Sequence, residues 1–479
     1  MKKIFIYAFY FFSFLASASP WIYENSIEYI AIENELRVNC GVYRYFVSSS
    51  PQSIESLFNE AKVKNENNLN DKCIASLDKA NKFIINNFSN NIVNYGFQTE
   101  IDDLYLQERG QRYPHKKNIF LSSSRIIDKF FYKIKVSKNS KGYNFDHTEF
   151  SYLINKNSVL RFGSFDRWWS PSDNTSLIFS NVARPIISLG IQNYQSIPFK
   201  NSFLNKFFGN YDYDIFLGRL EKDRSIPNAL LFGNRFSFNP NKNVNISLLR
   251  VAQFGGKGRN VNSTVIKNMI LGKDNTNREL DFLEQPGNQI AGIDFSITLP
   301  TKTYTNIYAQ YVGEDGLDPI IDDRWVGAIF PSKRFGLFGF SFANNANLNS
   351  WKYTVEHINT DTGFKNITYN HALYKTGYRY KGKPIGAAID TDSHNTIFSM
   401  QRYTNNRFIK LKYEDMKLNQ NSSSNSQWGD KPINNKQFSI KLSQKLKGNI
   451  QIDIILIHRD ISNISYDRNA VFLKFKQSI

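Results

Sequence analysis

The chain has 479 residues and a formal net charge of +18, although only 21% of its residues are charged. Beyond the first twenty residues it has no apolar run of about 18 residues, which excludes a membrane-spanning helix. The positive charge attracts polyanions. Because an exported chain without a binding motif is a poor candidate for nucleic acid, acidic polysaccharide and the phosphates of lipopolysaccharide are the expected partners. A biased codon composition is the alternative explanation for the many lysines.

Residues 1–18 have the layout of a cleavable export signal. Lys2 and Lys3 precede an apolar stretch, and the small residues from Ala16 to Ala18 supply a cleavage site. The apolar stretch is shorter than the roughly 20 residues that a spanning helix needs, so an uncleaved anchor is the weaker alternative. The mature chain is therefore expected to leave the cytoplasm and to begin near Ser19.

Residues 19–115 are expected to form a small helical domain on the periplasmic side of a membrane. Apolar residues recur at helical spacing after Ser50, a capping residue, and again within residues 71–88. Cys40 and Cys73 can form one disulfide in an oxidising compartment. Closing that loop of about 30 residues is worth ~3 kcal/mol on the chain-entropy model. Two free buried thiols are the alternative, because the sequence does not reveal connectivity.

Residues 116–479 are expected to form a transmembrane β-barrel. Apolar and polar residues alternate in 408–416 and in 438–446, which is the period of a strand, and residues 447–449 indicate a hairpin turn between strands. This alternation suits a soluble sandwich or a barrel. The export signal and the 40 Phe, 26 Tyr and 6 Trp favour the barrel, because aromatic belts at the two interfaces use such residues. At roughly 20 residues per strand and connection, about 16 to 18 antiparallel strands are expected.

Sets of catalytic or metal-binding residues are scarce. The six histidines show no zinc-binding spacing, and no nucleophile elbow is present. Asp390, Asp392 and His394 share a face if their segment is extended, which allows a weak cation site, but a solvated loop or lumen face is the favoured interpretation. The glycine-rich residues 254–260 lack the Lys-Ser/Thr pair of a phosphate loop and indicate a hairpin or bulge. The sequence therefore predicts neither an enzyme nor a bound cofactor or metal.

Six sequence blocks, taken together and in order, resemble the Wzi-type capsule assembly proteins. They are DRWWSPSDNTSLIFSNVARP (166–185), GRLEKDRSIPNALLFGNRFSFNP (218–240), SLLRVAQFGGKGR (247–259), EQPGNQIAGIDF (284–295), IYAQYVGED (307–315) and YNHALYKTGYRYKGKPIGAAIDTDS (369–393). The resemblance implies an outer-membrane lectin, a barrel of about 18 strands with a helical bundle at its periplasmic mouth. Such a protein binds capsular polysaccharide and helps to hold it at the cell surface, and a monomer is expected. A diffusion porin is the alternative, but it needs an open lumen.

The stretch RWWSPSDNTS, residues 167–176, is the focus of the site prediction. Successive side chains of a strand point to opposite faces, so one of its two indoles is expected to reach the ligand side. Under the resemblance, Trp beside Arg and Asp offers a stacking surface and planar polar partners for a sugar. The residues expected to contact polysaccharide are Arg167, Trp168, Trp169, Asp173, Arg184, Glu221, Lys222, Asp223 and Arg224. The alternative places one indole in the interface belt and the charges in a salt-bridged network inside the lumen.

Overall fold

The protein is described here from a computed structural model. The structure describes residues 32, 35, 36, 39, 40, 49, 50, 58, 71–88, 92–109, 116–155, 157–193, 197–241, 243–270, 283, 287–299, 303–314, 320, 321, 324, 325, 333–343, 351–404, 406–462 and 467–479. The predicted signal, residues 1–18, lies outside these residues. Among the helices that are described, none is long and apolar enough to cross a membrane.

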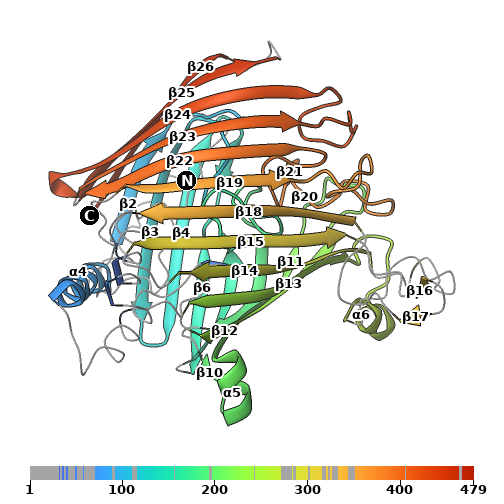
Figure 1. Ribbon diagram of the computed structural model, residues 1–479, viewed down its shortest axis with the longest axis horizontal. Helices are drawn as coiled ribbons and strands as arrows, with labels where there is room; N and C mark the ends of the chain where they lie inside the picture. Colours follow the sequence, from blue (N-terminus) through green and yellow to red (C-terminus); the bar gives the residue numbers. More distant parts are fainter. Residues whose placement is uncertain are drawn as a thin grey trace, which may run out of the picture.

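The fold is a closed barrel of 18 antiparallel strands, which confirms the predicted class. Figure 1 shows the strands side by side around one ring. In ring order they are β2 (Ile92–Gln98), β3 (Asn118–Ile127), β4 (Phe130–Asn139), β6 (Glu149–Asn155), β7 (Ser158–Ser164), β9 (Ile187–Asn193), β11 (Asn210–Arg219), β12 (Leu230–Asn241), β13 (Val244–Phe254), β14 (Asn288–Thr298), β15 (Tyr304–Glu314), β18 (Lys333–Ala343), β19 (Lys352–Asn359), β22 (His394–Thr404), β23 (Arg407–Leu418), β24 (Ile433–Leu446), β25 (Ile450–Ile461) and β26 (Asn469–Ser478).

Short elements decorate this ring. A short strand, β5 (Gly142–Asn144), extends the pairing of β4, and β10 (Ile197–Pro198) extends that of β11. Three two-stranded ribbons lie outside the ring pairing: β1 (Ser49–Ser50) with β8 (Trp168–Trp169), β16 (Ile320–Ile321) with β17 (Arg324–Trp325), and β20 (Arg379–Tyr380) with β21 (Lys383–Pro384). The helices whose bounds lie within the described residues are α4 (Asp71–Phe88), α5 (Ser202–Phe208) and α6 (Ser263–Ile270), with the 3-10 turn η1 (Lys447–Asn449).

The ring closes where β2 pairs with β26. The register runs from Asn94 opposite Ser478 to Gln98 opposite Lys474, and the rings of Phe97 and Phe475 stack with centroids 6.1 Å apart. The barrel therefore begins at β2, inside the residues 19–115 that the sequence assigned to the helical domain. Because this seam joins strands from the two ends of the described barrel, it leaves no open sheet edge around the ring.

Side-chain alternation in β23 explains why these residues form a barrel wall. Lys410, Lys412 and Glu414 face the lumen and are buried, whereas Leu411 and Tyr413 between them face outward. The outward positions of the other strands follow the same rule and include Leu121, Phe162, Leu189, Ile215, Leu217, Phe338, Phe340, Val355, Phe398, Phe438 and Leu473, all exposed. An apolar exterior around a polar interior is the arrangement that a lipid bilayer requires of a transmembrane barrel.

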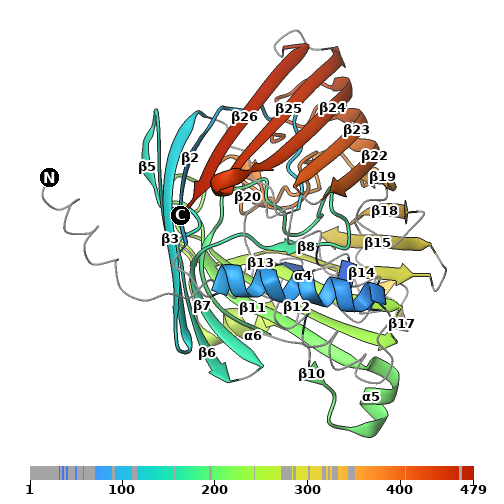
Figure 2. The same ribbon diagram turned by 90° about the vertical axis from the view of Figure 1, so that its left-hand side faces the viewer.

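The two ends of the barrel differ. Short turns such as residues 128–129 and the 3-10 turn η1 lie at the end where β2 begins and β26 finishes, whereas long connections such as residues 165–186 and 360–393 lie at the opposite end. In outer-membrane barrels the short turns are periplasmic and the long loops extracellular. The short-turn end is accordingly the periplasmic end, and Figure 2 shows α4 lying across it.

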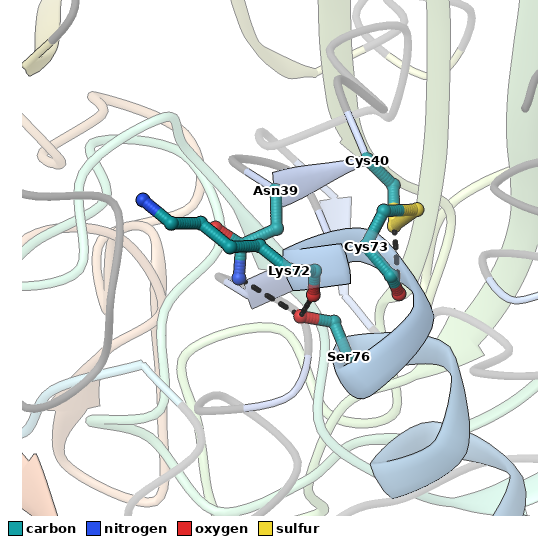
Figure 3. Close-up of a disulfide and its surroundings, with 5 residues drawn as sticks. All are labelled: Asn39, Cys40, Lys72, Cys73 and Ser76. Carbon is teal, nitrogen blue, oxygen red and sulfur yellow. Dashed lines mark hydrogen bonds between the residues drawn. A yellow bond between two sulfur atoms is a disulfide. The ribbon is translucent and has the colours of Figure 1, made fainter. Parts of the chain in front are cut away.

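Helix α4 coincides with the helix expected at residues 71–88, and a disulfide ties it to the chain before it. Cys73 is joined to Cys40, with the two Cα atoms 4.8 Å apart, as Figure 3 shows. Next to this bond, Ser76 Oγ accepts a hydrogen bond from Asn39 Nδ2 at 2.8 Å and donates one to the carbonyl of Lys72 at 2.9 Å. The bond therefore holds the buried face of α4 against the residues around position 40.

The core of the protein lies inside the barrel. We call residues 99–109, 165–186 and 360–393 the inward segments, because each leaves the extracellular end of a strand and packs against lumen-facing side chains. Their buried members Leu104, Phe179 and Tyr378 belong to one apolar cluster with wall residues such as Leu231 and Val312. The inward segments thus give the lumen a packed interior, and they position most of the residues that the sequence singled out.

Candidate functional site

Trp168 and Trp169 lie inside the barrel, and both are buried, with 1% and 0% of their surface exposed. The ring nitrogen of Trp168 donates to the carbonyl of Ser172 at 2.8 Å, and that of Trp169 donates to Asp214 Oδ2 at 3.3 Å. The expected exposed indole is therefore not found. Strand β8 pairs with β1 within the lumen, where both of its faces are covered, so alternation sends neither ring to a free surface.

Arg167 is also buried and belongs to a charge network within the lumen. Its Nε lies 3.3 Å from Asp214 Oδ2 and its NH1 donates to Ser188 Oγ at 2.9 Å. The guanidinium also stacks over Phe165 and Phe216, 4.3 and 4.0 Å from their ring centroids. These contacts use the polar and the planar surfaces of the side chain, so Arg167 holds residues 165–186 against the wall.

Asp173 connects two inward segments with the barrel wall. Its carboxylate accepts from Lys352 Nζ at 3.1 Å and from Arg109 NH1 at 3.4 Å, while its carbonyl accepts from the backbone of Arg109 at 2.9 Å. Burial raises the pKa of Asp173, but the charges of Lys352 and Arg109 lower it more, so the net shift is downward. The carboxylate is therefore ionised at neutral pH. Arg167 and Asp173 are both in salt bridges inside the lumen, as in the alternative to a polysaccharide contact that the sequence allowed.

Glu108 completes the network and was not among the predicted residues. It is buried and lies 3.0 Å from Lys410 Nζ and 3.1 Å from Lys412 Nζ on β23. Burial raises the pKa of Glu108, but the positive charges of Lys410, Lys412 and Lys441 together have the larger, opposite effect. The net result is a pKa lowered to about 2. The alternation of lysines in 408–416 was visible in the sequence, but nothing near residue 108 marked it as their partner.

The predicted residues 221–224 lie in the extracellular connection between β11 and β12. Arg224 is buried and donates to the carbonyls of Gly377 at 3.1 Å and Arg379 at 3.0 Å, so it fastens this connection to an inward segment. The carboxylate of Glu221 lies 3.5 Å from the Arg224 guanidinium. Lys222 and Asp223 are exposed. Within this group, Arg224 is therefore a buried structural residue, whereas Lys222 and Asp223 face solvent.

Arg184 is the predicted residue that keeps both solvent access and a fixed geometry. Its guanidinium makes a bidentate pair with Asp146, with distances of 2.7 and 2.8 Å, and 41% of its side chain is exposed. Close to this pair, Lys381 Nζ lies 5.3 Å from the ring centroid of Tyr380. The pKa of Lys381 is lowered first by its partial burial and then by the positive charge of Arg184. Lys381 itself is exposed at the turn between β20 and β21.

We call these extracellular residues the outer patch: Asp146, Arg184, Glu221, Lys222, Asp223, Tyr380 and Lys381. They come from four connections that are distant in sequence, and Asp146 and Glu221 both act electrostatically on Lys381. Sugars are recognised by planar charged groups that bind hydroxyls and carboxylates, and by aromatic rings beside them. The outer patch supplies charged groups of both signs together with the edge of a largely buried tyrosine.

The two acidic residues of the segment 390–394, Asp390 and Asp392, are structural. Asp390 is buried and accepts from Arg379 at 2.6 Å and from the backbone of Gln427 at 2.7 Å. Asp392 is also buried, and accepts from the backbone of Asn366 at 3.0 Å and from Ser423 Oγ. Of the two expected alternatives, a solvated loop or a lumen face, the solvated loop is not found, because both carboxylates are buried in an inward segment inside the barrel. Among the residues that the structure describes, no group of three or more His, Cys, Asp or Glu could hold a metal ion.

Comparison with known proteins identifies the family. The model of the family described as capsule assembly protein Wzi matches residues 86–470. The chain belongs to this family. A relative from Klebsiella pneumoniae, an uncharacterised 55.8 kDa protein in the cps region, is 32% identical over 161 residues. That match spans 33% of this chain and about a third, 31%, of the relative's length.

The Wzi-family fold is also evident from a solved structure. Wzi of Escherichia coli has a TM-score of 0.80 to this chain at 20% identity, and the match covers 96% of this chain and 99% of the other. That protein is described as an outer membrane protein involved in group 1 capsule assembly and as a carbohydrate-binding β-barrel. At this identity the comparison establishes the fold. Together with the apolar exterior of the closed ring, it makes this Wzi-family chain an outer-membrane β-barrel.

Proposed function

We propose that this Wzi-family protein is an outer-membrane lectin that binds capsular polysaccharide and promotes its attachment and assembly at the cell surface. The role is one of binding rather than catalysis. The observation that carries the proposal is the outer patch, a group of charged side chains with a tyrosine at the extracellular end of a barrel of this family. The Escherichia coli relative's description as carbohydrate-binding supports it.

The outer patch suits an acidic polysaccharide. Arg184 and Lys381 would pair with its carboxylates, and the exposed Asp223 would accept hydrogen bonds from its hydroxyls. A single patch of this size binds weakly, but a polysaccharide repeats its unit many times and touches many barrels. Repetition of a weak contact raises the overall avidity by orders of magnitude, on the order of 10²-fold or more. Retention of capsule therefore does not require a deep sugar pocket.

The proposal includes the surroundings of the barrel. The protein acts as a monomer, with lipopolysaccharide around its extracellular half. The closed ring supports a monomer because it leaves no sheet edge for a second copy. The inward segments also disfavour a diffusion channel, because their buried apolar side chains pack against the lumen-facing wall.

The test compares cell-bound with released polysaccharide in a capsulated strain whose copy of this gene is deleted. Deletion is expected to move polysaccharide from the cells into the medium, and the wild-type gene to restore retention. The double variant Arg184→Glu and Lys381→Glu is expected to restore little, because each lost charge-assisted hydrogen bond weakens binding by about tenfold or more. Lys365→Glu is the matched control, an exposed lysine of residues 360–393 that lies outside the patch.

The comparison of retention requires that the wild type, the double variant and the control variant reach the same level of assembled barrel in the outer membrane. Lys381 is exposed, but Arg184 is only partly exposed and forms a bidentate pair with Asp146, so the amount of assembled double variant in the outer membrane is measured alongside retention. Full retention by the double variant would move the polysaccharide contact away from the outer patch. Unchanged retention in the deletion strain would contradict the lectin function itself.

A further inference from the structure

Helix α5 is a short helix with a defined beginning and end. It lies in the connection between β9 and β11, at the periplasmic end of the barrel. Asn201 caps its start, because its Oδ1 accepts from the backbone of Phe203 at 2.9 Å and of Leu204 at 3.2 Å. Gly209 ends it with a positive φ of 66°, and a Cβ at this position would collide with the carbonyl oxygen of Asn239. The helix is therefore held in one place on the barrel.

The apolar residues of α5 have no protein core to cover them. Phe203, Leu204, Phe207 and Phe208 occupy adjoining i and i+4 rows and so form one face of the helix. None of the residues of α5 is buried, and Phe203 and Phe207 are 66% and 53% exposed. Their rings contact each other, with centroids 4.7 Å apart. A contiguous apolar face of this kind marks an interaction surface.

The apolar face continues the aromatic belt of the barrel wall. Tyr211 on β11 and Phe236 and Phe238 on β12 lie near the periplasmic end, at positions that alternate with the buried lumen-facing residues of their strands. The ring of Phe208 meets that of Phe238 edge to face at 5.2 Å, and Phe199 bridges Phe208 and Tyr211 at 6.1 and 4.7 Å. Figure 1 shows α5 projecting to the side of the barrel wall, beyond β10 and β12.

We propose that α5 is an interfacial anchor that lies in the periplasmic leaflet of the outer membrane, with its apolar face among the acyl chains. Lys200 precedes the helix and Lys206 lies on its polar face, and both are exposed. They contact the phosphates of the leaflet's phospholipids. The helix thus fixes how deeply the periplasmic end of the barrel sits in the membrane.

Two observations select lipid as the partner. The apolar face is continuous with strand residues that already face lipid, so the bilayer reaches the helix without any further surface. The division into an apolar arc and a polar arc carrying Lys206 is that of a helix lying in a membrane interface. This inference is independent of polysaccharide binding, because it concerns the opposite end of the barrel.

The test places a spin label at Phe203→Cys or at Asn205→Cys in the full-length protein reconstituted into phospholipid bilayers. Cys40 and Cys73 are joined to each other, so the introduced thiol is the reactive one. In bilayers, the label at 203 should be relaxed more by oxygen, which partitions into acyl chains. The label at 205 should be relaxed more by a water-soluble nickel chelate. Phe364→Cys on the extracellular side is the water-exposed control.

Equal access of the nickel chelate to positions 203, 205 and 364 would overturn the proposal and would leave a protein partner as the occupant of α5. Because none of the residues of α5 is buried, the cysteine variants should keep the heat-modifiable barrel. The lysines are tested with vesicles that contain or lack phosphatidylglycerol. Lys200→Glu with Lys206→Glu should reduce the preference for the anionic vesicles by roughly fivefold per lysine. An unchanged preference would overturn the phosphate contact.

Discussion

Two aromatic pairs of this protein have opposite surroundings. Trp168 and Trp169 are enclosed by the barrel, whereas Phe203 and Phe207 lie outside its wall at the periplasmic end. Both pairs belong to connections rather than to wall strands, so local hydrophobicity does not distinguish them. The connection containing the tryptophans leaves the extracellular end of β7 and turns into the lumen, and the other remains beside the wall. The comparison shows that the path of a connection decides whether its aromatic residues stabilise the protein or face the membrane.

The largest effect is expected from Trp169→Ala. Its ring packs against Phe179 and Phe216 at 5.5 and 5.7 Å, and its carbonyl accepts from Gln310 at 2.7 Å. Truncating a buried Trp costs about 3 to 5 kcal/mol. Heat-modifiable migration or urea unfolding in detergent should therefore show a much less stable barrel, or a lower yield of assembled protein. A wild-type transition would mean that residues 165–186 do not stabilise the barrel.

Glu108→Gln should have the next largest effect, because it removes one partner of a buried ion pair, at a cost of about 3 kcal/mol. Its pKa of about 2 lies below its ordinary value of 4.5, so its stabilising contribution is present above pH 4.5. That contribution is lost as the pH falls towards 2. Urea unfolding measured from pH 7 to pH 2.5 should show a smaller loss of stability below pH 4.5 in Glu108→Gln than in wild type. Parallel curves would contradict this role.

The double variant Cys40→Ser and Cys73→Ser compares the stability of the region around α4, at the periplasmic end, with that of the barrel wall. The disulfide closes a loop with a sequence separation of 33, and its removal should destabilise the region around α4 by about 3 to 4 kcal/mol. The barrel wall does not depend on that bond. Limited proteolysis should therefore cleave residues near α4 faster, while the heat-modifiable transition of the barrel stays in place. A lower transition temperature would show that the two regions unfold together.

The smallest effect is expected from Phe203→Ala in detergent. This ring contributes to no protein core, so unfolding stability should change by no more than about 0.5 kcal/mol. The contrast with Trp169→Ala, measured by the same transition, is a direct comparison of the two aromatic pairs. A large loss of stability in Phe203→Ala would place α5 among the elements that support the barrel.

The strands of the barrel wall were predictable from the sequence, but the packing of the segments inside the lumen was not. Lipid on one side and polar groups on the other impose a period of two on each strand, as in residues 408–416, and the alternation is confirmed in β23. Inside the lumen both faces of a segment are covered, so alternation does not determine the exposure of Trp168 and Trp169. The long-range partners of Arg224 and Asp173 lie in connections whose paths a linear pattern does not encode. Helix α5 did leave a signal, since Asn201, the spaced phenylalanines and Gly209 form a capped amphipathic turn.

The seam between β2 and β26 has a consequence for the order of assembly. Its side chains are separated by more than 370 residues, as in the contact of Thr99 with Leu473 and that of Asn94 with Ser478. Contacts of such high sequence separation form late, since the intervening chain must be ordered first. Until then β2 and β26 both present unpaired backbone groups, which invite pairing with other chains. Closing the ring is therefore the committed step of biogenesis, and the interval before it is when the nascent protein depends most on chaperones.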